Sequence, residues 1–508
     1  MANNDVDVIV VGAGSAGNVL ARRLLDAGRT VAVLEAGGPA SNPVIEHVAQ
    51  AGALWRGPED WDYVTTPQAG LDGRALHLPR GKVLGGSHAL NATIWVRGAK
   101  EDFDAWAYRG CPGWSWEEVL PVFKAIENFD GGASELRGTE GLLDVRGDFR
   151  RDEIQDSILQ ACTQWGLSED ADYNDGSPDG VSKMQLNVRD NKRFNTWNAY
   201  LEPVSGSESL RLITGARVSH LLIEDGTAVG VEYLDAEGER HQLRAAETVL
   251  AAGALGSPEV LLRSGIGPEA ELREAGVEPV LDLPGVGKNL HDHFLAPVIY
   301  EAAREVGAPG VGAAETHHFW RSTPDLAVPD TQPLHFSLPM YFLDDMGGPE
   351  NGFSLVAGIV RPAARGSLTL TGPSLQDPVA VDVGALGDAS DVASMVASLR
   401  QCREIGRQEA LAEGWGAREV YPGPDVDDSD EALAAYARAR TVTYHHQVGT
   451  CRMGLDDGAV VDPRTMRVRG VAGLRVADAS VMPDITTGNT NAPTIMIAER
   501  AAQMMLAG

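Results

Sequence analysis

Residues 7–38 read DVIVVGAGSAGNVLARRLLDAGRTVAVLEAGG, and this stretch decides the fold. Residues 8–11 form an unbroken apolar run, which is typical of a parallel strand buried on both faces. Apolar residues then recur with helical spacing up to Gly28, a residue suited to the end of a helix. A second apolar run covers residues 31–34 and ends at Glu35. The order predicts a strand, a helix and a second parallel strand.

A glycine motif, GxGxxG, stands where the first predicted strand meets the helix. Gly12 permits a tight turn, Gly14 lets the backbone approach a pyrophosphate, and Gly17 lets the helix pack on the strand. The phosphates would then lie at the positive N-terminus of the helix. Glu35, 18 residues after Gly17, can accept hydrogen bonds from ribose hydroxyls. The stretch therefore predicts a bound dinucleotide, either NAD or FAD.

Length, charge and cysteine content argue against several classes of protein. A chain of 508 residues is long for one hydrophobic core, so we expect two domains. The formal net charge of −30 argues against nucleic acid or an anionic membrane surface as a partner. Four cysteines without zinc-type spacing fit free thiols in a reducing compartment. Because no signal-peptide flank and no apolar run of about 18 residues is found, we expect a soluble, cytoplasmic protein without a membrane span.

Three further segments carry motifs. Residues 79–98 read PRGKVLGGSHALNATIWVRG, residues 248–267 read TVLAAGALGSPEVLLRSGIG, and residues 443–454 read TYHHQVGTCRMG. Near the C-terminus, residues 488–499 read GNTNAPTIMIAE and contain the expected start of a closing helix, near Asn491 and Pro493. Together with the N-terminal motif, these segments resemble those of the glucose–methanol–choline (GMC) oxidoreductases along essentially the whole chain. His88 departs from the family pattern, which usually has a small residue there.

The resemblance implies the fold. It is an α/β fold in which a Rossmann-like FAD-binding domain is joined to a second α+β domain, whose antiparallel sheet covers the flavin face. Since the motifs are dispersed, the FAD-binding domain is expected to be discontinuous, over residues 1–145, 190–295 and 440–508. Residues 146–189 and 296–439 then form the substrate-binding domain.

The resemblance also implies FAD and the residues that bind it. Glu35 is expected at the adenosine ribose, Val218 at the adenine, and Asp478 with Ala479 beside the ribityl chain. Family members that tether FAD use a histidine immediately before the loop asparagine. That position is Leu90 here, so FAD is predicted to be non-covalent. The predicted cofactor site comprises Gly12, Gly14, Ser15, Ala16, Gly17, Glu35, Ala36, Val83, Gly86, Ser87, Asn91, Ala92, Thr93, Ile94, Val218, His445, Asp478, Ala479, Asn489 and Thr490.

Two adjacent histidines, His445 and His446, supply the candidate for catalysis. Alcohol oxidation removes a hydroxyl proton as well as a hydride, and histidine is the usual proton acceptor near neutral pH. By resemblance His446 is the base, and Asn489 is a partner whose amide donates to the developing oxyanion. His445 is interpreted as a wall or spacer, with a second base as the alternative. Gln447 replaces the usual proline of the family, which loosens the local backbone.

Other histidines are less informative. His291 and His293 flank Asp292 in NLHDHF, but the family carries a similar segment without a metal, and no metal site is predicted. The middle region alternates in places like strands of a half-buried sheet. It offers candidates for the substrate pocket: His317, His318, His335, Phe336 and Tyr341.

The favoured function is FAD-dependent oxidation of a CH–OH group to a carbonyl. The hydride would pass to flavin N5 and the proton to His446, from a small polar or aromatic alcohol or a sugar. The electron acceptor is O₂, a quinone or a carrier protein, and the chain is a monomer or a homo-oligomer. Two alternatives stay open: a lyase of the hydroxynitrile lyase or fatty acid photodecarboxylase type, and a flavin-binding protein without turnover.

Overall fold

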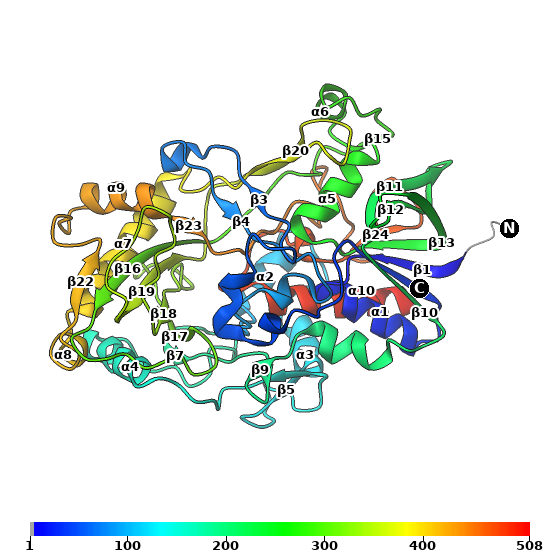
Figure 1. Cartoon of the computed structure of the whole chain (residues 1–508). Helices are drawn as coiled ribbons and strands as arrows, with labels where there is room; N and C mark the ends of the chain where they lie inside the picture. The colour runs from blue at the N-terminus through cyan, green and yellow to red at the C-terminus, as the bar shows by residue number, and fades with distance from the viewer. Residues whose placement is uncertain (1–4, 508) are drawn as a thin grey trace.

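The first sheet combines strands from both ends of the chain (Figure 1). A computed structural model describes residues 5–507, so residues 1–4 and 508 of the predicted FAD-binding domain lie outside the described residues. In spatial order the strands are β10 (Leu210–Thr214), β2 (Val31–Glu35), β1 (Val6–Val11), β13 (Arg240–Leu250), β12 (Thr227–Leu234) and β11 (Arg217–Glu224). A short strand from near the C-terminus, β24 (Leu474–Val476), pairs in parallel with the end of β13.

The parallel half of this sheet contains the predicted strand–helix–strand unit. β1 pairs in parallel with β2 and with β13, and β2 is buried along its whole length. Helix α1 (Ser15–Asp26) connects β1 to β2 and ends just before Gly28, which has a φ of +77°. In Figure 1, α1 and the closing helix α10 (Asn491–Ala507) pack together below these strands, and α5 (Gly253–Arg263) lies above them. The predicted α/β fold is confirmed.

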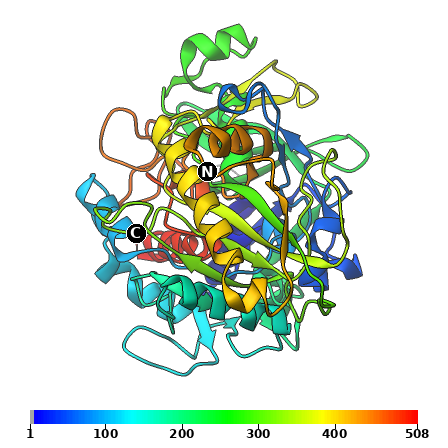
Figure 2. The ribbon, with the colours of Figure 1, turned by 90° about the vertical axis from the view of Figure 1, so that its left-hand side faces the viewer.

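The second sheet is antiparallel throughout. Its order is β22 (Arg418–Tyr421), β16 (Phe294–Glu301), β19 (Gly352–Ile359), β18 (Leu334–Phe336), β17 (Ala314–Phe319) and β7 (Gly180–Lys183), and β23 (Val442–Thr443) also pairs with β16. Three helices pack on it: α4 (Glu153–Trp165), α7 (Ala389–Gly406) and α9 (Asp430–Arg440). Figure 2 shows α7 and α9 lying across one face. The predicted antiparallel sheet of the second domain is therefore present.

The second sheet crosses the predicted domain limits. β16 begins at Phe294, before the predicted boundary at residue 296, and β23 follows the predicted end at residue 439. Parts of the chain predicted to belong to the FAD-binding domain, the start of β16 and the whole of β23, thus pair within the second sheet. The division into domains stays a prediction. No helix in the described part of the chain is long and apolar enough to cross a membrane.

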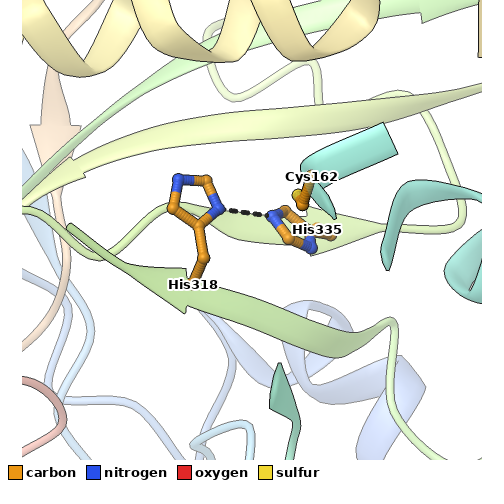
Figure 3. A group of neighbouring side chains, drawn as sticks. All are labelled: Cys162, His318 and His335. Atoms are coloured by element: carbon orange, nitrogen blue, oxygen red, sulfur yellow. Dashed lines mark hydrogen bonds between the residues drawn. The ribbon is translucent and has the colours of Figure 1, made fainter. Parts of the chain in front are cut away.

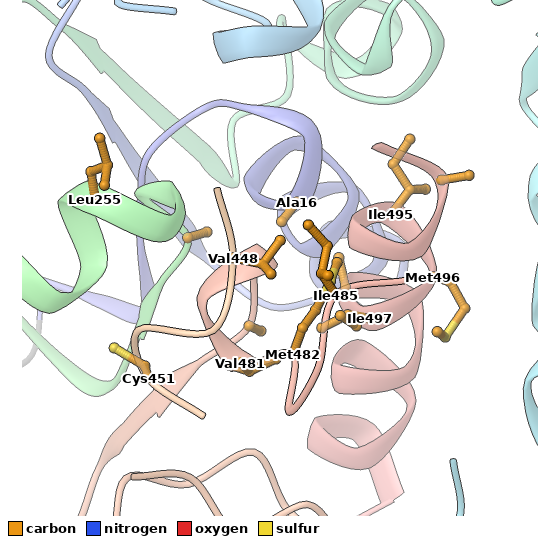
Figure 4. Close-up of a cluster of buried hydrophobic side chains, with 14 of the residues drawn as sticks. Ala16, Leu255, Val448, Cys451, Val481, Met482, Ile485, Ile495, Met496 and Ile497 are labelled. Atoms are coloured by element: carbon orange, nitrogen blue, oxygen red, sulfur yellow. The ribbon is translucent and has the colours of Figure 1, made fainter. Parts of the chain in front are cut away.

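A buried apolar cluster joins the last part of the chain to the N-terminal unit (Figure 4). Val448 and Cys451, which follow His446 in the chain, are fully buried, and so is Met482. They belong to the same cluster as Ala16 on α1 and several residues of α10. Burying a side chain of the size of valine or methionine contributes about 1.5–3 kcal/mol. The segment that carries His446 is thereby anchored to the nucleotide-binding unit.

Candidate active site

A cavity of about 500 Å³ is lined by residues of both sheets. One end is formed by the carboxyl ends of β1 and β2, and the other by side chains of β16, β17 and β18. Nearly all the predicted site residues line it: Gly12, Gly14, Ser15, Ala16, Glu35, Ala36, Gly86, Ser87, Asn91, Ala92, Thr93, Ile94, Val218, His445, His446, Asp478, Ala479, Asn489 and Thr490. Gly17 and Val83 do not line the cavity and are buried behind it.

Glycines are required where the loops at the nucleotide end meet. A Cβ on Gly17 would lie 1.8 Å from the carbonyl oxygen of Gly12, so α1 can approach the turn only at a glycine. A Cβ on Gly86 would lie 2.6 Å from the Cα of Gly14, because the two glycine loops touch there. Gly12 itself has a φ of +99°, in the left-handed region. The backbone at Gly14 is therefore bare toward the cavity, as a bound pyrophosphate requires.

Glu35 joins two turns at the nucleotide end. Its Oε2 accepts a hydrogen bond from the backbone N–H of Ala13 at 2.9 Å, and its Oε1 accepts one from Gly37 at 2.9 Å. Burial raises the pKa of Glu35 to about 7, although the two N–H donors act in the opposite direction. The carboxyl group fixes both turns, and its remaining lone pairs can accept further hydrogen bonds.

Charged and aromatic residues that sequence analysis missed gather next to Val218. Arg217 pairs with Glu259 at 3.3 Å, and Glu259 pairs with Arg263 at 2.9 Å. The guanidinium of Arg217 lies 5.2 Å from the ring centre of Trp61. All of these residues line the cavity. The sequence carried signals for three of them: Arg217 directly precedes Val218, and Glu259 and Arg263 lie within the motif of residues 248–267.

His446 and Asn489, 43 residues apart in the chain, meet at the cavity. The distance between Asn489 Nδ2 and His446 Nε2 is 3.1 Å. His446 follows β23, whereas Asn489 lies just before α10, so the packing of these segments brings the two side chains together. The positive end of the 17-residue helix α10 adjoins the same place.

The amide of Asn489 is oriented by a residue of the second domain. Gln332 Nε2 donates to Asn489 Oδ1 at 3.1 Å and also lies 3.0 Å from His317 Nδ1. Since the Asn489 oxygen accepts from Gln332, the Asn489 nitrogen faces His446 and donates to Nε2 of its ring. Nothing in the sequence motifs pointed to Gln332, because its role arises only from the contact between the segment before β18 and the segment before α10.

His293 contacts the opposite nitrogen of the His446 ring, with 3.0 Å between the two Nδ1 atoms. Because Nε2 of His446 accepts a hydrogen bond, the neutral ring carries its proton on Nδ1 and donates it to His293. Burial lowers the pKa of His446 well below its ordinary value, and the neighbouring histidines lower it further. His446 is therefore neutral, and the lone pair on Nε2 lies at the cavity.

Asp292 holds the backbone around His446. It accepts hydrogen bonds from the His446 backbone N–H at 2.8 Å and from the side chains of Thr443 and Gln447. Burial raises the pKa of Asp292 to about 6, and these donors oppose the rise. Gln447, where the family usually has proline, thus compensates for the looser backbone through a side-chain hydrogen bond.

Comparison with known proteins identifies the family. A family model described as "GMC oxidoreductase" matches residues 6–295, and a second model with the same description matches residues 362–498. The chain belongs to the GMC oxidoreductase family. It is 36% identical to an alcohol dehydrogenase [acceptor] of Pseudomonas putida, over 98% of this chain and 95% of that protein. It is 35% identical to an oxygen-dependent choline dehydrogenase of Brucella anthropi, over 99% of this chain and 96% of that protein.

Solved structures of GMC oxidoreductases have the same fold. The crystal structure of pyridoxine 4-oxidase from Mesorbium loti superposes with a TM-score of 0.94 and 34% identity, over 99% of this chain and 100% of that one. A formate oxidase of Aspergillus oryzae superposes with a TM-score of 0.91 and 25% identity, over 99% of this chain and 98% of that one. The resemblance inferred from the motifs is thereby confirmed.

FAD is the cofactor typical of GMC oxidoreductases, and the cavity of this one fits it. The bare backbone at Gly14 and the N-terminus of α1 suit a pyrophosphate. Glu35 offers carboxylate lone pairs at the end of β2, where a ribose would lie. The cavity continues from there to His446 and Asn489, so a single extended ligand can reach from the nucleotide end to these two residues.

His445, the neighbour of His446 in the chain, lies in a different wall of the cavity of this GMC oxidoreductase. Its φ is +67°, which turns the chain sharply at this position. Its carbonyl oxygen accepts a hydrogen bond from Arg80 at 2.6 Å, and its ring meets Trp55 edge-on with 4.9 Å between ring centres. Burial lowers the pKa of His445 to about 3. These contacts support the interpretation of His445 as a wall rather than a second base.

His88, the departure from the GMC pattern, is fully buried but does not line the cavity. Its ring nitrogens lie 3.3 Å from Nδ2 of Asn491, which does line it. Burial lowers the pKa of His88 to about 3, with the nearby Arg193 adding to the effect. The neutral ring therefore supports Asn491 from behind.

Another group of buried side chains, Cys162, His318 and His335, lies outside the cavity between α4 and the second sheet (Figure 3). Their possible ligand atoms lie within 4.8 Å of one another. The ring nitrogens are already engaged, however. His318 lies 3.0 Å from His335 and 3.0 Å from Gln401, and His335 lies 2.9 Å from Thr316. The group thus ties α7 to β17 and β18 by hydrogen bonds.

The contact between His293 and His446 leads to a prediction. In His293→Phe an aromatic ring is kept, but the Nδ1–H of His446 loses its acceptor. Because the imidazolium that forms during proton uptake then lacks this hydrogen bond, we expect flavin reduction to slow by about 5- to 100-fold. His293→Gln supplies a carbonyl acceptor and is expected to recover most of the rate. Anaerobic stopped-flow measurements on both variants, at equal FAD content, check this. Equal rates in the two variants would contradict it.

Proposed function

We propose that the chain oxidises an alcohol CH–OH group to a carbonyl, with the hydride passing to flavin N5 and the proton to His446. The observation that carries the proposal is the neutral imidazole of His446, whose Nε2 lies at the cavity beside the amide of Asn489. Breaking the O–H bond of an alcohol requires one group that accepts the proton and a second group that donates a hydrogen bond to the oxygen.

The residues divide the work as follows. FAD, when bound, supplies the hydride acceptor. When the alcohol hydroxyl replaces the Asn489 amide as the donor to His446 Nε2, this nitrogen takes the hydroxyl proton. His293 stabilises the resulting imidazolium by accepting from Nδ1–H. The amide N–H of Asn489, held by Gln332, donates to the substrate oxygen as negative charge develops there. Asp292 keeps the backbone of His446 in place.

Anaerobic mixing of the purified yellow protein with a panel of alcohols tests the proposal. Bleaching of the flavin absorbance by at least one alcohol, with the matching carbonyl as product, is the expected result. A protein that binds FAD but is bleached by none of them would contradict it. Light-dependent release of CO₂ from a fatty acid, or cleavage of a hydroxynitrile, would instead support a lyase. Comparison of peroxide with dye reduction then identifies O₂, or a quinone or carrier, as the electron acceptor.

FAD is proposed to be bound without a covalent link. The residue before Asn91 is Leu90, which has no nucleophilic atom, and the ring of His88 does not line the cavity. We therefore expect acid precipitation to release the yellow colour into the supernatant. Colour that stays with the protein pellet, and a flavin-bearing peptide after proteolysis, would show a covalent link.

A further inference from the structure

Alternate residues along one segment line the cavity. The segment begins with β18 and continues to residue 342. Its cavity-lining side chains, which we call the apolar stripe, are Leu334, Phe336, Leu338, Met340 and Phe342. The last four are only partly buried, because the cavity lies in front of them. Of the five pocket candidates that the sequence offered in this region, only Phe336 lines the cavity.

Polar residues of the same segment point away from the cavity. His335 lies 2.9 Å from Thr316 and 3.0 Å from His318, on the side where α4 and α7 pack. The hydroxyl of Tyr341 donates to the carbonyl oxygen of Pro349 at 2.9 Å. Side chains of a strand alternate between two faces, as in β18. The cavity lining shows that the alternation continues to residue 342, past the bends at Ser337 and Leu338. The sequence has therefore placed its apolar residues on the one face that a ligand can reach.

Tyr444 connects the apolar stripe to the catalytic base. Its ring stacks on His446, with 4.5 Å between ring centres and 23° between the planes. Tyr444 also belongs to the same hydrophobic cluster as Leu334, and Phe336 packs against that cluster. An alcohol whose hydroxyl meets His446 would consequently have its carbon chain against the stripe.

Charged residues line other parts of the cavity. They are Glu35, Arg80, Arg217, Glu259, Arg263 and Asp478. None belongs to the second sheet or to the stripe, and Glu259 already pairs with both Arg217 and Arg263. Among the described residues, the stripe therefore offers no carboxylate to a cationic substrate. Nor does it offer the polar groups that several buried sugar hydroxyls would need.

We propose that the substrate is a neutral alcohol with an extended apolar body, either a medium-chain alkanol or an arylalkanol. This proposal rests on the alcohol oxidation proposed above. It predicts that apolar alcohols are better substrates than sugars and quaternary ammonium alcohols. Each methylene group that the stripe removes from water strengthens binding about fourfold. Aromatic alcohols gain further from the rings of Phe336 and Phe342.

A homologous series measures this effect. The holoenzyme is assayed with 1-alkanols from ethanol to decanol, together with benzyl alcohol, choline and glucose, and kcat/KM is determined with an artificial dye. We expect kcat/KM to rise about three- to fourfold per methylene until the stripe is covered. Choline and glucose are expected to be at least about 100-fold poorer than 1-octanol. A flat series, or choline or glucose as the best substrate, would overturn the proposal.

Variants of the same segment supply matched controls. Phe336→Ala and Met340→Ala remove parts of the apolar stripe, and we expect each to lower kcat/KM for 1-octanol about tenfold while ethanol changes little. Tyr341→Phe alters the same segment on its other face and should leave the dependence on chain length intact. FAD content, from the absorbance of each variant, shows that the fold is kept. An unchanged dependence in both alanine variants would remove the stripe from the binding site.

Binding without turnover separates the two possible failures. In His446→Ala, binding of the same alkanols is followed through the change that they cause in the flavin spectrum. Affinity that rises with chain length, in a protein whose native form no alcohol bleaches, would support the apolar stripe and overturn the oxidation. Bleaching of the native form by alcohols of every length, with affinity independent of length, would keep the oxidation and overturn the stripe.

Discussion

Replacing His446 with alanine is expected to lower the rate constant of anaerobic flavin reduction by about 10²- to 10⁴-fold, the usual contribution of a positioned base. The reason lies in the state of the ring. Nε2 is unprotonated and lies at the cavity, whereas Nδ1–H is held by His293. Without the imidazole, the hydroxyl proton has no acceptor of comparable basicity within the catalytic pair, since the amide of Asn489 cannot take it up.

The adjacent histidine provides the control for this experiment. His445 lies in the same turn, but its ring packs against Trp55 and not against Asn489. His445→Ala is therefore expected to keep flavin reduction within about tenfold of the native rate. Stopped-flow traces of both variants, at equal FAD content, make the comparison. A fast His446→Ala variant, or an equally slow His445→Ala variant, would contradict the assignment of the base.

Replacing Asn489 with leucine is expected to lower the rate of flavin reduction by about 10²- to 10³-fold, the typical cost of losing one donor to a developing oxyanion. Leucine has the same number and branching of side-chain heavy atoms, so the change removes the N–H and the carbonyl oxygen but opens no cavity. It also leaves Nε2 of Gln332 with one partner fewer. The loss should therefore appear in the rate of reduction at saturating alcohol more than in KM.

Asn489→His is the matched variant, because it restores an N–H donor at this position. We expect the Asn489→His variant to reduce flavin at least about tenfold faster than the Asn489→Leu variant. If leucine and histidine variants reduce flavin equally slowly, the donated hydrogen bond is not what Asn489 contributes. If the leucine variant is as fast as the native protein, Asn489 has no part in the chemical step.

Local features of the chain allowed much of the fold and site to be predicted. The turn at Gly12 and the packing at Gly17 depend on residues within one strand–helix unit, so the pattern alone indicates them. His446 and Asn489 were predicted from motifs, and the structure brings them within hydrogen-bonding distance. The roles of these residues, the domain limits and the cellular location stay predictions.

Contacts between distant segments could not be predicted in the same way. His293 lies 153 residues before His446 and looked like part of a structural segment, because no local pattern links the two rings. Gln332 lies 157 residues before Asn489 and belongs to no motif. The apolar stripe could be predicted only in part. An alternating pattern indicates that a segment has two faces, but it does not indicate which face borders a cavity.

The pairing of β24 with β13 has a consequence for folding during synthesis on the ribosome. Asp478, directly beyond β24, accepts a hydrogen bond from Gly253, which the ribosome has made 225 residues earlier. At about 5–20 residues per second, that interval lasts roughly 11–45 s. During it, the hydrogen-bonding edge at the end of β13 is bare, and such an edge invites association with other chains. The first sheet can therefore be completed only after β24 has been synthesised, late in translation.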